Sequence, residues 1–431
     1  MKLFPVVVAI GVAVCRGGFG QGAAPLRLTL EEALERARAN SPQIVSANIA
    51  ALLAHEDTVQ AKAALLPGVS GFSQYIYTQP NGLPSGVFVS NDGPHVYNNQ
   101  LAVHADIYAP AKLADYHKTQ LAEAVARAKT EIAARGLIAT VVDNYYSMVT
   151  AARKLANAQQ SQREAEQFFD ITQKLERGGE AAHYDTVKAE TQLVQRRREV
   201  QEAQLGLDKE RLGFSVLLFP DFRQDFSLVD DLDTARQLPD FAEIQTLAGR
   251  NSPDIRVAQA TVEQQNFEIK SARAAMLPSL SFDYFYGMNS NEFAIHDREG
   301  HMNLGSVAQA EVTIPIWTWG AARSRVKQAE LHLQQARSDL TLAQRQLLAN
   351  LNTFYLEANT ARVQLASLQQ SLNLASDSLR LTLLRYQGGE GSVLEVVDAQ
   401  GTLVEARNAF DEGKARYRLA LANLQTLTGA F

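Results

Sequence analysis

The residues that could carry chemistry are few and scattered. The chain has eight histidines and a single cysteine, Cys15. His296 and His301 bracket a stretch that we expect to be an exposed loop; a metal-binding pair there is conceivable, but a solvated loop is favoured. Glu31 and Glu32 begin a predicted helix and are not placed as an acid–base pair. No glycine loop that could cradle a phosphate follows a predicted strand. We therefore predict no catalytic site, no metal site and no cofactor.

A second group of polar residues alternates with apolar ones, as in β-strands. The ranges 68–108 and 279–317 are each expected to form a β-hairpin. In both, one face is polar, which is typical of strands that enclose water within a lipid bilayer, although a half-buried soluble strand would alternate in the same way. We predict that Phe282 and Ile314 face lipid. The residues expected to line a barrel lumen are His104, Asp106, Asp283, Gln309 and Glu311.

Long helices must carry these strands. Residues 321–387 contain no Gly and no Pro, and their apolar residues alternate at spacings of four and three, which is a heptad seam. One helix of this length would measure roughly 100 Å. A Gly turn follows, and a second helix completes a helical hairpin over 321–428. A similar hairpin is expected over 111–219.

The order of elements occurs twice. Ser41-Pro42 recurs as Ser252-Pro253, 211 residues later, and Gly178-Gly179 recurs as Gly388-Gly389, 210 residues later. An internal duplication follows from this spacing. We predict a first structural repeat over 21–219, an equatorial linker over 220–250 and a second repeat over 251–431.

The first 20 residues are typical of a secretory signal peptide, with Lys2, an apolar segment from Val6 to Val14 and a small-residue cleavage site. Cys15 could alternatively be a lipidated N-terminus, but Val14 stands where that processing needs a small residue, so loss with the signal peptide is favoured. The net charge is −6, with no basic cluster, which argues against nucleic acid as a partner.

Four strands cannot close a barrel, and an unpaired strand edge cannot face lipid. If these strands enter a membrane, several copies of the chain must combine them. The fold class is therefore mainly α with a membrane β-barrel portion, in which the helical hairpins form a tube beneath the barrel.

Several motifs in this order resemble the TolC family of bacterial outer-membrane efflux proteins. They are the segments 29–34, 65–67, 276–280, 314–317 and, as the most specific, 385–400. The resemblance covers the whole mature chain. It implies a homotrimer with a twelve-stranded barrel in the outer membrane and an α-helical barrel in the periplasm. It also implies an export route completed by a periplasmic adaptor protein and an inner-membrane pump.

The resemblance also implies roles for residues near the Gly turns. Tyr386 and Asp185 match positions that link neighbouring helical hairpins and hold the tunnel closed. Gly391 stands where a well-known closed member has an Arg link, so the closed state is expected to be held less firmly. Glu395 and Asp398 match acidic positions that ring the aperture. The tips expected to contact the adaptor are Gly178, Gly179, Gly388 and Gly389.

A soluble periplasmic coiled-coil adaptor or a structural protein would have similar long hairpins. The two strand pairs distinguish these classes, because an adaptor needs no lipid-facing alternation. We therefore predict a trimeric outer-membrane channel that serves as a passive exit duct of a tripartite efflux or type I secretion system.

Overall fold

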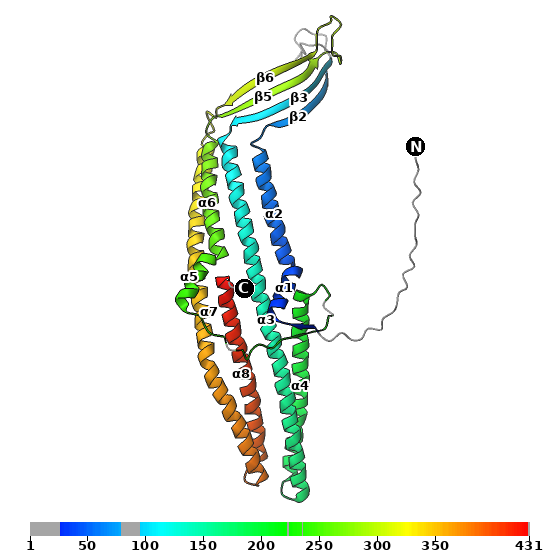
Figure 1. Ribbon diagram of the computed structural model, residues 1–431, viewed down its shortest axis with the longest axis vertical. Coiled ribbons are helices and arrows are strands. Elements are labelled where there is room, and N and C mark those ends of the chain that lie inside the picture. The colour runs from blue at the N-terminus through cyan, green and yellow to red at the C-terminus, as the bar shows by residue number, and fades with distance from the viewer. Residues whose placement is uncertain (1–25, 79–94, 222–223, 235, 430–431) are drawn as a thin grey trace, which may run out of the picture.

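The computed structural model describes residues 26–78, 95–221, 224–234 and 236–429. The predicted signal peptide and Cys15 lie outside these residues. The molecule is elongated, with a β-sheet at one end and the tips of two helical hairpins at the other (Figure 1).

The elements follow the same order in the two halves of the chain. The first half contains β1 (Leu26–Leu28), α1 (Leu30–Asn40), α2 (Pro42–Ala63), β2 (Gly68–Tyr77), β3 (His95–Tyr108), α3 (Pro110–Gly178) and α4 (His183–Leu218). The second half contains β4 (Phe226–Leu228), α5 (Phe241–Asn251), α6 (Pro253–Ala274), β5 (Ser279–Ser290), β6 (Leu304–Thr313), α7 (Ala321–Gln387) and α8 (Val393–Thr428). The Gly-free, Pro-free stretch predicted as one helix is α7.

Side-chain caps and prolines set where the shorter helices begin. The Thr29 side chain accepts from the amide of Glu32, and the Glu32 carboxylate accepts from the amide of Thr29, which closes a capping box at α1. Ser41 and Ser252 cap α2 and α6, each followed by a proline at the first helical position. An N–H at the first helical position has no acceptor within the helix, so proline loses no hydrogen bond there.

The four long strands form one antiparallel sheet in the order β2-β3-β5-β6. Its central pair joins the two halves of the chain, because β3 pairs with β5 from Tyr97 to Tyr108. The pairing is irregular between Asp106 and Tyr108, so Ile107 lies outside the regular ladder. Within the described residues, β2 and β6 each have a partner on one side only.

The second β-hairpin is shorter than predicted. β6 ends at Thr313, four residues before the expected end at Trp317, so Ile314 is not a strand residue. Pro315 gives the physical reason: it has no N–H to donate to a ladder and fixes its own φ. Trp317 and Trp319 follow beside each other, with ring centroids 5.7 Å apart.

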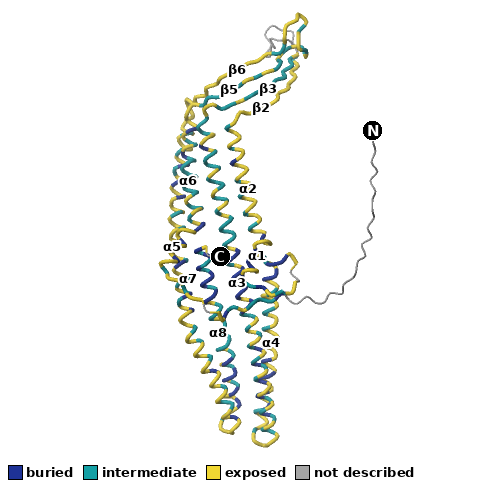
Figure 2. Tube along the Cα trace, viewed as in Figure 1, coloured by how far each residue is buried: buried dark blue, intermediate teal, exposed yellow. Residues whose placement is uncertain are grey.

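Two helices run the full length between the sheet and the tips. α3 packs against α2 and α6 in the half near the sheet, and against α4 and α8 in the half near the tips; α7 packs likewise against α6 and then α8. Buried residues concentrate around the middle of the molecule and along the facing sides of the hairpins (Figure 2). The helices thus form a layer in which α3 joins both hairpins.

The predicted linker over 220–250 contains a short strand, β4, that the sequence did not indicate. β4 pairs in parallel with β1, and the helix α5 follows it. Tyr145 of α3 is fully buried beneath this pair and donates to the carbonyl of Val229 at 2.6 Å. Phe214 and Leu28 complete the same core cluster, so the linker packs as part of the middle of the molecule.

Charged residues fix the linker to the helices. The Arg153 guanidinium of α3 donates to Asp230 at 2.6 Å, to Asp233 at 2.7 Å and to Asp411 of α8 at 2.7 Å. Lys414 of α8 donates to the other oxygen of Asp233 at 2.6 Å. This group, which we call the linker clamp, connects α3, α8 and the linker.

Among the described helices, none is both long enough and apolar enough to cross a membrane.

Candidate functional site

The two hairpin tips have the same backbone construction. Gly179 and Gly389 adopt left-handed conformations with φ of 77° and 76°, which glycine adopts without steric cost. At each tip a following amide bonds back to the helix end: Glu180 to the carbonyl of Leu175 at 2.8 Å, and Glu390 to that of Arg385 at 2.9 Å. The four predicted tip glycines therefore lie at the two turns that end α3 and α7.

Tyr386 and Asp185 lie in contact next to these turns. Tyr386 is in the last turn of α7 and Asp185 is in the first turn of α4, and the Tyr386 hydroxyl donates to Asp185 Oδ2 at 3.3 Å. The Tyr386 ring is only 5% exposed and packs edge-on against Phe168, with centroids 5.2 Å apart. The structure thus brings the predicted gate-link pair together within one chain, between the two hairpins.

The Tyr386 hydroxyl is protonated at neutral pH, and burial moves its pKa further above neutrality. Desolvation, followed by the charge of Asp185 and the hydrogen bond to it, raises the pKa of Tyr386 to about 12. The hydroxyl is therefore a donor at neutral pH, and the carboxylate is its acceptor. A hydrogen bond to a charged group is stronger than one between neutral groups.

Gly391 has a role beyond the missing Arg side chain. A Cβ at this position would lie 3.0 Å from the amide nitrogen of Tyr386 and 3.3 Å from its Cα. Both atoms are backbone and cannot move aside without shifting the end of α7. The close approach of this turn to Tyr386 therefore favours glycine, because any larger residue would push the end of α7 by a few tenths of an ångström.

Glu395 and Asp398 are both exposed in the first turns of α8. The Glu395 carboxylate accepts from Arg385 at 3.2 Å, while its amide bonds to the Ser392 cap. Asp398 has no side-chain partner in the described part of the chain. The structure places both acids beside the turn that joins α7 to α8. Their arrangement around the axis of an oligomer depends on how neighbouring chains pack.

The five polar residues predicted for a lumen share one face of the sheet. The register aligns His104 with Asp283 and Asp283 with Gln309, and it aligns Asp106 with Ser281 and Ser281 with Glu311. Residues directly opposite each other in an antiparallel pair lie on the same face. His104 Nδ1 and Asp283 Oδ1 are 2.6 Å apart, which joins the two halves of the sheet.

The sequence analysis missed one member of this face. Lys112, in the first turn of α3, forms an ion pair with Asp106. A cation one helical turn after the strand could have been noticed as a partner for the strand carboxylates, but the strand alternation alone did not include it. Phe282, predicted to face lipid, lies on the opposite face, in register with Ala105 and Ala310.

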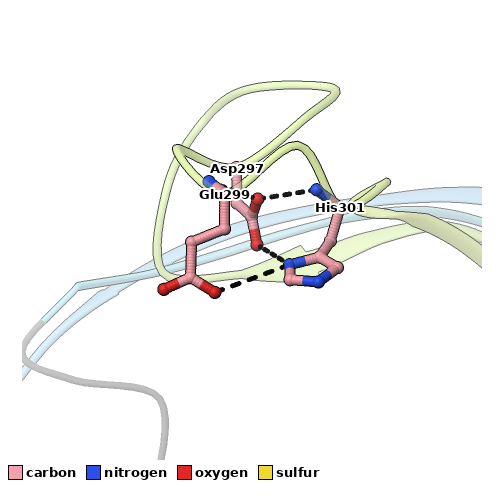
Figure 3. A group of neighbouring side chains, drawn as sticks. All are labelled: Asp297, Glu299 and His301. Carbon is pink, nitrogen blue, oxygen red and sulfur yellow. Dashed lines mark hydrogen bonds and ion pairs between the residues drawn. The ribbon is translucent and has the colours of Figure 1, made fainter.

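A second group missed by the sequence analysis lies in the β5–β6 loop. Asp297, Glu299 and His301 converge there (Figure 3). His296, the other histidine of the pair considered from the sequence, instead forms an isolated β-bridge with Met302. The acidic residues at two and four positions before His301 were the available signal.

Comparison with known proteins gives a consistent result. The family described as outer membrane efflux protein matches residues 33–214 and 245–430. Proteases secretion protein PrtF of Dickeya chrysanthemi is 22% identical over 95% of this chain and 89% of its own length. Outer membrane protein TolC of Vibrio cholerae is 22% identical over 93% and 90%.

Solved structures have the same fold. The CmeC outer membrane channel of Campylobacter jejuni superposes with a TM-score of 0.81 at 20% identity, covering 93% of this chain and 85% of that one. The outer membrane protein VceC of Vibrio cholerae superposes with a TM-score of 0.82 at 16% identity, covering 93% and 96%.

Proposed function

Because the chain belongs to the outer membrane efflux protein family, we propose that it is the exit duct of a tripartite efflux or type I secretion system. It is an outer-membrane protein and conducts exported molecules passively from the periplasm to the exterior. Relatives that match nearly the whole chain are named as a secretion protein and an outer membrane protein. These names support a channel over a soluble adaptor or a structural protein.

The observation that carries the proposal is the four-stranded sheet mounted on long helices. Within the described residues, each of its outer strands, β2 and β6, is paired on one side only. In a bilayer each unpaired backbone N–H and C=O costs several kcal/mol, so only a closed barrel spans lipid stably. Pairing β2 of one copy with β6 of the next would satisfy both edges.

We propose a homotrimer, in which three copies of the four-stranded sheet give a barrel of twelve strands. The face that carries His104, Asp283 and Gln309 would line the lumen, and the face that carries Phe282 would contact lipid. The helices α3 and α7, with their shorter partners, would continue the barrel as an α-helical tunnel in the periplasm.

The periplasmic end is the proposed gate. The Tyr386–Asp185 bond would hold the hairpins of one chain together and so hold the tunnel closed. Glu395 and Asp398 from three chains would place six carboxylates near one axis, which would favour cations and repel anions. The two Gly turns would present the surface that contacts a periplasmic adaptor, through which an inner-membrane pump delivers its cargo.

Fractionation and recording test the function directly. The full chain is expected in the outer-membrane fraction as a cross-linkable trimer and should form cation-selective pores in planar bilayers. Replacing Glu395 with Gln and Asp398 with Asn should weaken the selectivity without preventing assembly. Recovery of the chain as a soluble periplasmic monomer without pore activity would overturn the proposal.

A further inference from the structure

The β5–β6 loop brings three metal-ligating side chains together at the end of the sheet that lies away from the helices (Figures 1 and 3). His301 Nδ1 lies 2.9 Å from Asp297 Oδ2 and 3.8 Å from Glu299 Oε2. One ligand atom from each residue lies within 4.8 Å of the other two. Asp297 is partly buried, whereas Glu299 and His301 are exposed, so the group is open to solvent.

These separations are close to those that a shared metal ion requires. Zinc binds imidazole nitrogen and carboxylate oxygen at about 2.0–2.2 Å, which places two ligand atoms of a tetrahedral site about 3.4 Å apart. The 2.9 Å and 3.8 Å separations fall on either side of this value. The Asp297 and Glu299 oxygens lie within 4.8 Å of each other, so sharing one ion requires the exposed Glu299 side chain to rotate toward the other two ligands.

The charge of the group points to a cation. The group contains two carboxylates and one imidazole. The nearby Arg298 forms its ion pair with Glu292, at 2.9 Å, and not with the carboxylates of this group. Within the described residues, Glu299 pairs only with His301.

The loop holds Asp297 so that one of its oxygens stays available. Asp297 Oδ1 accepts from the amides of Glu299 at 2.8 Å and His301 at 2.7 Å. Gly300 makes the turn between them with φ of 90°. Asp297 Oδ2 is left to face the imidazole, and such supporting hydrogen bonds orient metal ligands in proteins.

We propose that Asp297, Glu299 and His301 form a binding site for a divalent first-row transition metal, with Zn²⁺ as the ion of reference. Imidazole nitrogen favours zinc, whereas sites made only of oxygen favour calcium or magnesium. Three protein ligands leave at least one position for water. The site is independent of the export function, and in a trimer it would occur three times.

The test measures Zn²⁺ binding to the purified full chain in detergent by isothermal titration calorimetry at a fixed pH of about 7.5, because metal affinity depends on pH. We expect one Zn²⁺ per chain at this site. Glu299→Gln and His301→Ala should each weaken binding at least tenfold, and Mg²⁺ in excess should not compete. His296→Ala is the matched control, because His296 lies in the same loop outside the group, and it should bind like the unchanged protein.

Glu299→Gln makes the test independent of folding. Glu299 is 82% exposed at its side chain and donates to Asp297 from its backbone amide, so its substitution leaves the Asp297 hydrogen bonds in place. Absence of Zn²⁺ binding in the unchanged protein would overturn the proposal. So would equal affinity in the Glu299→Gln and His296→Ala variants, because the metal would then bind elsewhere.

Discussion

A single hydroxyl connects α7 to α4 next to the tips. Tyr386→Phe combined with Asp185→Ala removes this hydrogen bond and the carboxylate while keeping the aromatic ring against Phe168. A hydrogen bond of this kind contributes about 1 kcal/mol net, so we expect the open-to-closed ratio of the pore to rise about fivefold. Single-channel recording in planar bilayers measures this ratio.

Tyr184→Phe is the control for that double variant. Tyr184 is 60% exposed, lies next to Asp185 in the sequence and makes no side-chain hydrogen bond among the described residues. Its substitution should leave the open fraction unchanged. An unchanged open fraction in the Tyr386 and Asp185 double variant would remove this pair from the gate while leaving the fold intact.

At the residue level, the sequence indicated some contacts and missed others for a physical reason. The Tyr386–Asp185 pair was predicted only through family resemblance, because the two residues are 201 positions apart. Arg153 was not singled out, since its three carboxylate partners lie on two other elements. The five polar residues predicted to line a lumen could be found from the sequence, because strand alternation alone places them on one face.

At the element level, the turn after α7 depends on Gly391. Gly391→Ala would bring a Cβ within 3.0 Å of the Tyr386 backbone, and such overpacking costs about 1–3 kcal/mol. We expect the amides of residues 385–392 to exchange with deuterium at least fivefold faster, because local opening there becomes easier. Hydrogen exchange measured by mass spectrometry reports on this segment.

Gly388→Ala is the matched change in the same turn. Its Cβ would lie 3.5 Å from the Leu384 carbonyl oxygen, an ordinary contact, and its φ of −83° suits alanine. Exchange in the turn should stay the same or become slower, since alanine restricts the unfolded chain. If both substitutions accelerated amide exchange equally, the close approach of Gly391 to Tyr386 would not be what resists local opening of the turn.

The linker clamp should make part of the stability depend on pH. Hydrogen bonds from Lys414 and then Arg153 lower the pKa of Asp233 to about 2 from an ordinary 3.8. A carboxylate whose pKa is lowered by folding contributes its full stabilisation at pH values above its pKa in the unfolded chain. This contribution is lost as the pH falls from about 4 to about 2. Asp233→Asn should therefore lower the thermal midpoint at pH 7 and reduce the further loss below pH 4.

Circular dichroism at several pH values measures these midpoints. Asp170→Asn on α3 is the control, because Asp170 is exposed and has no side-chain partner in the described part of the chain. It should follow the unchanged protein across the pH range. An Asp233→Asn midpoint that falls with acid as steeply as that of the unchanged protein would show that the clamp contributes nothing to acid sensitivity.

Elements with a long periodic pattern were predictable, and the three-residue strands were not. The heptad seam and the absence of Gly and Pro predicted α7 with its observed bounds, Ala321–Gln387. β1 and β4 were missed because three-residue strands carry no measurable alternation, and their parallel pairing joins residues 200 positions apart. The end of β6 was predicted four residues too late. Ile314 and Ile316 continue the apolar alternation, but the proline between them cannot join the hydrogen-bonded ladder.

For the whole molecule, the proposed barrel requires the two faces of the sheet to meet different solvents. Ala308 and Gln309 are neighbours near the middle of β6 and lie on opposite faces, in register with Tyr284 and Asp283 respectively. Both residues are exposed in the single chain. The structure of one copy therefore gives no reason for a lysine substitution at one position to be more harmful than at the other. Only lipid on one side and water on the other would distinguish them.

Ala308→Lys and Gln309→Lys therefore test the assembled molecule with one matched pair. A lysine on the lipid face near the bilayer midplane costs about 2–4 kcal/mol per chain, and a trimer would incur this cost three times. We expect Ala308→Lys to prevent accumulation of cross-linkable trimer in the outer membrane. Gln309→Lys should assemble normally and shift the pore conductance and ion selectivity, because its charge enters a water-filled lumen. Equal assembly of both variants would contradict a lipid-embedded barrel, and assembly of Ala308→Lys alone would mean that the two faces are reversed.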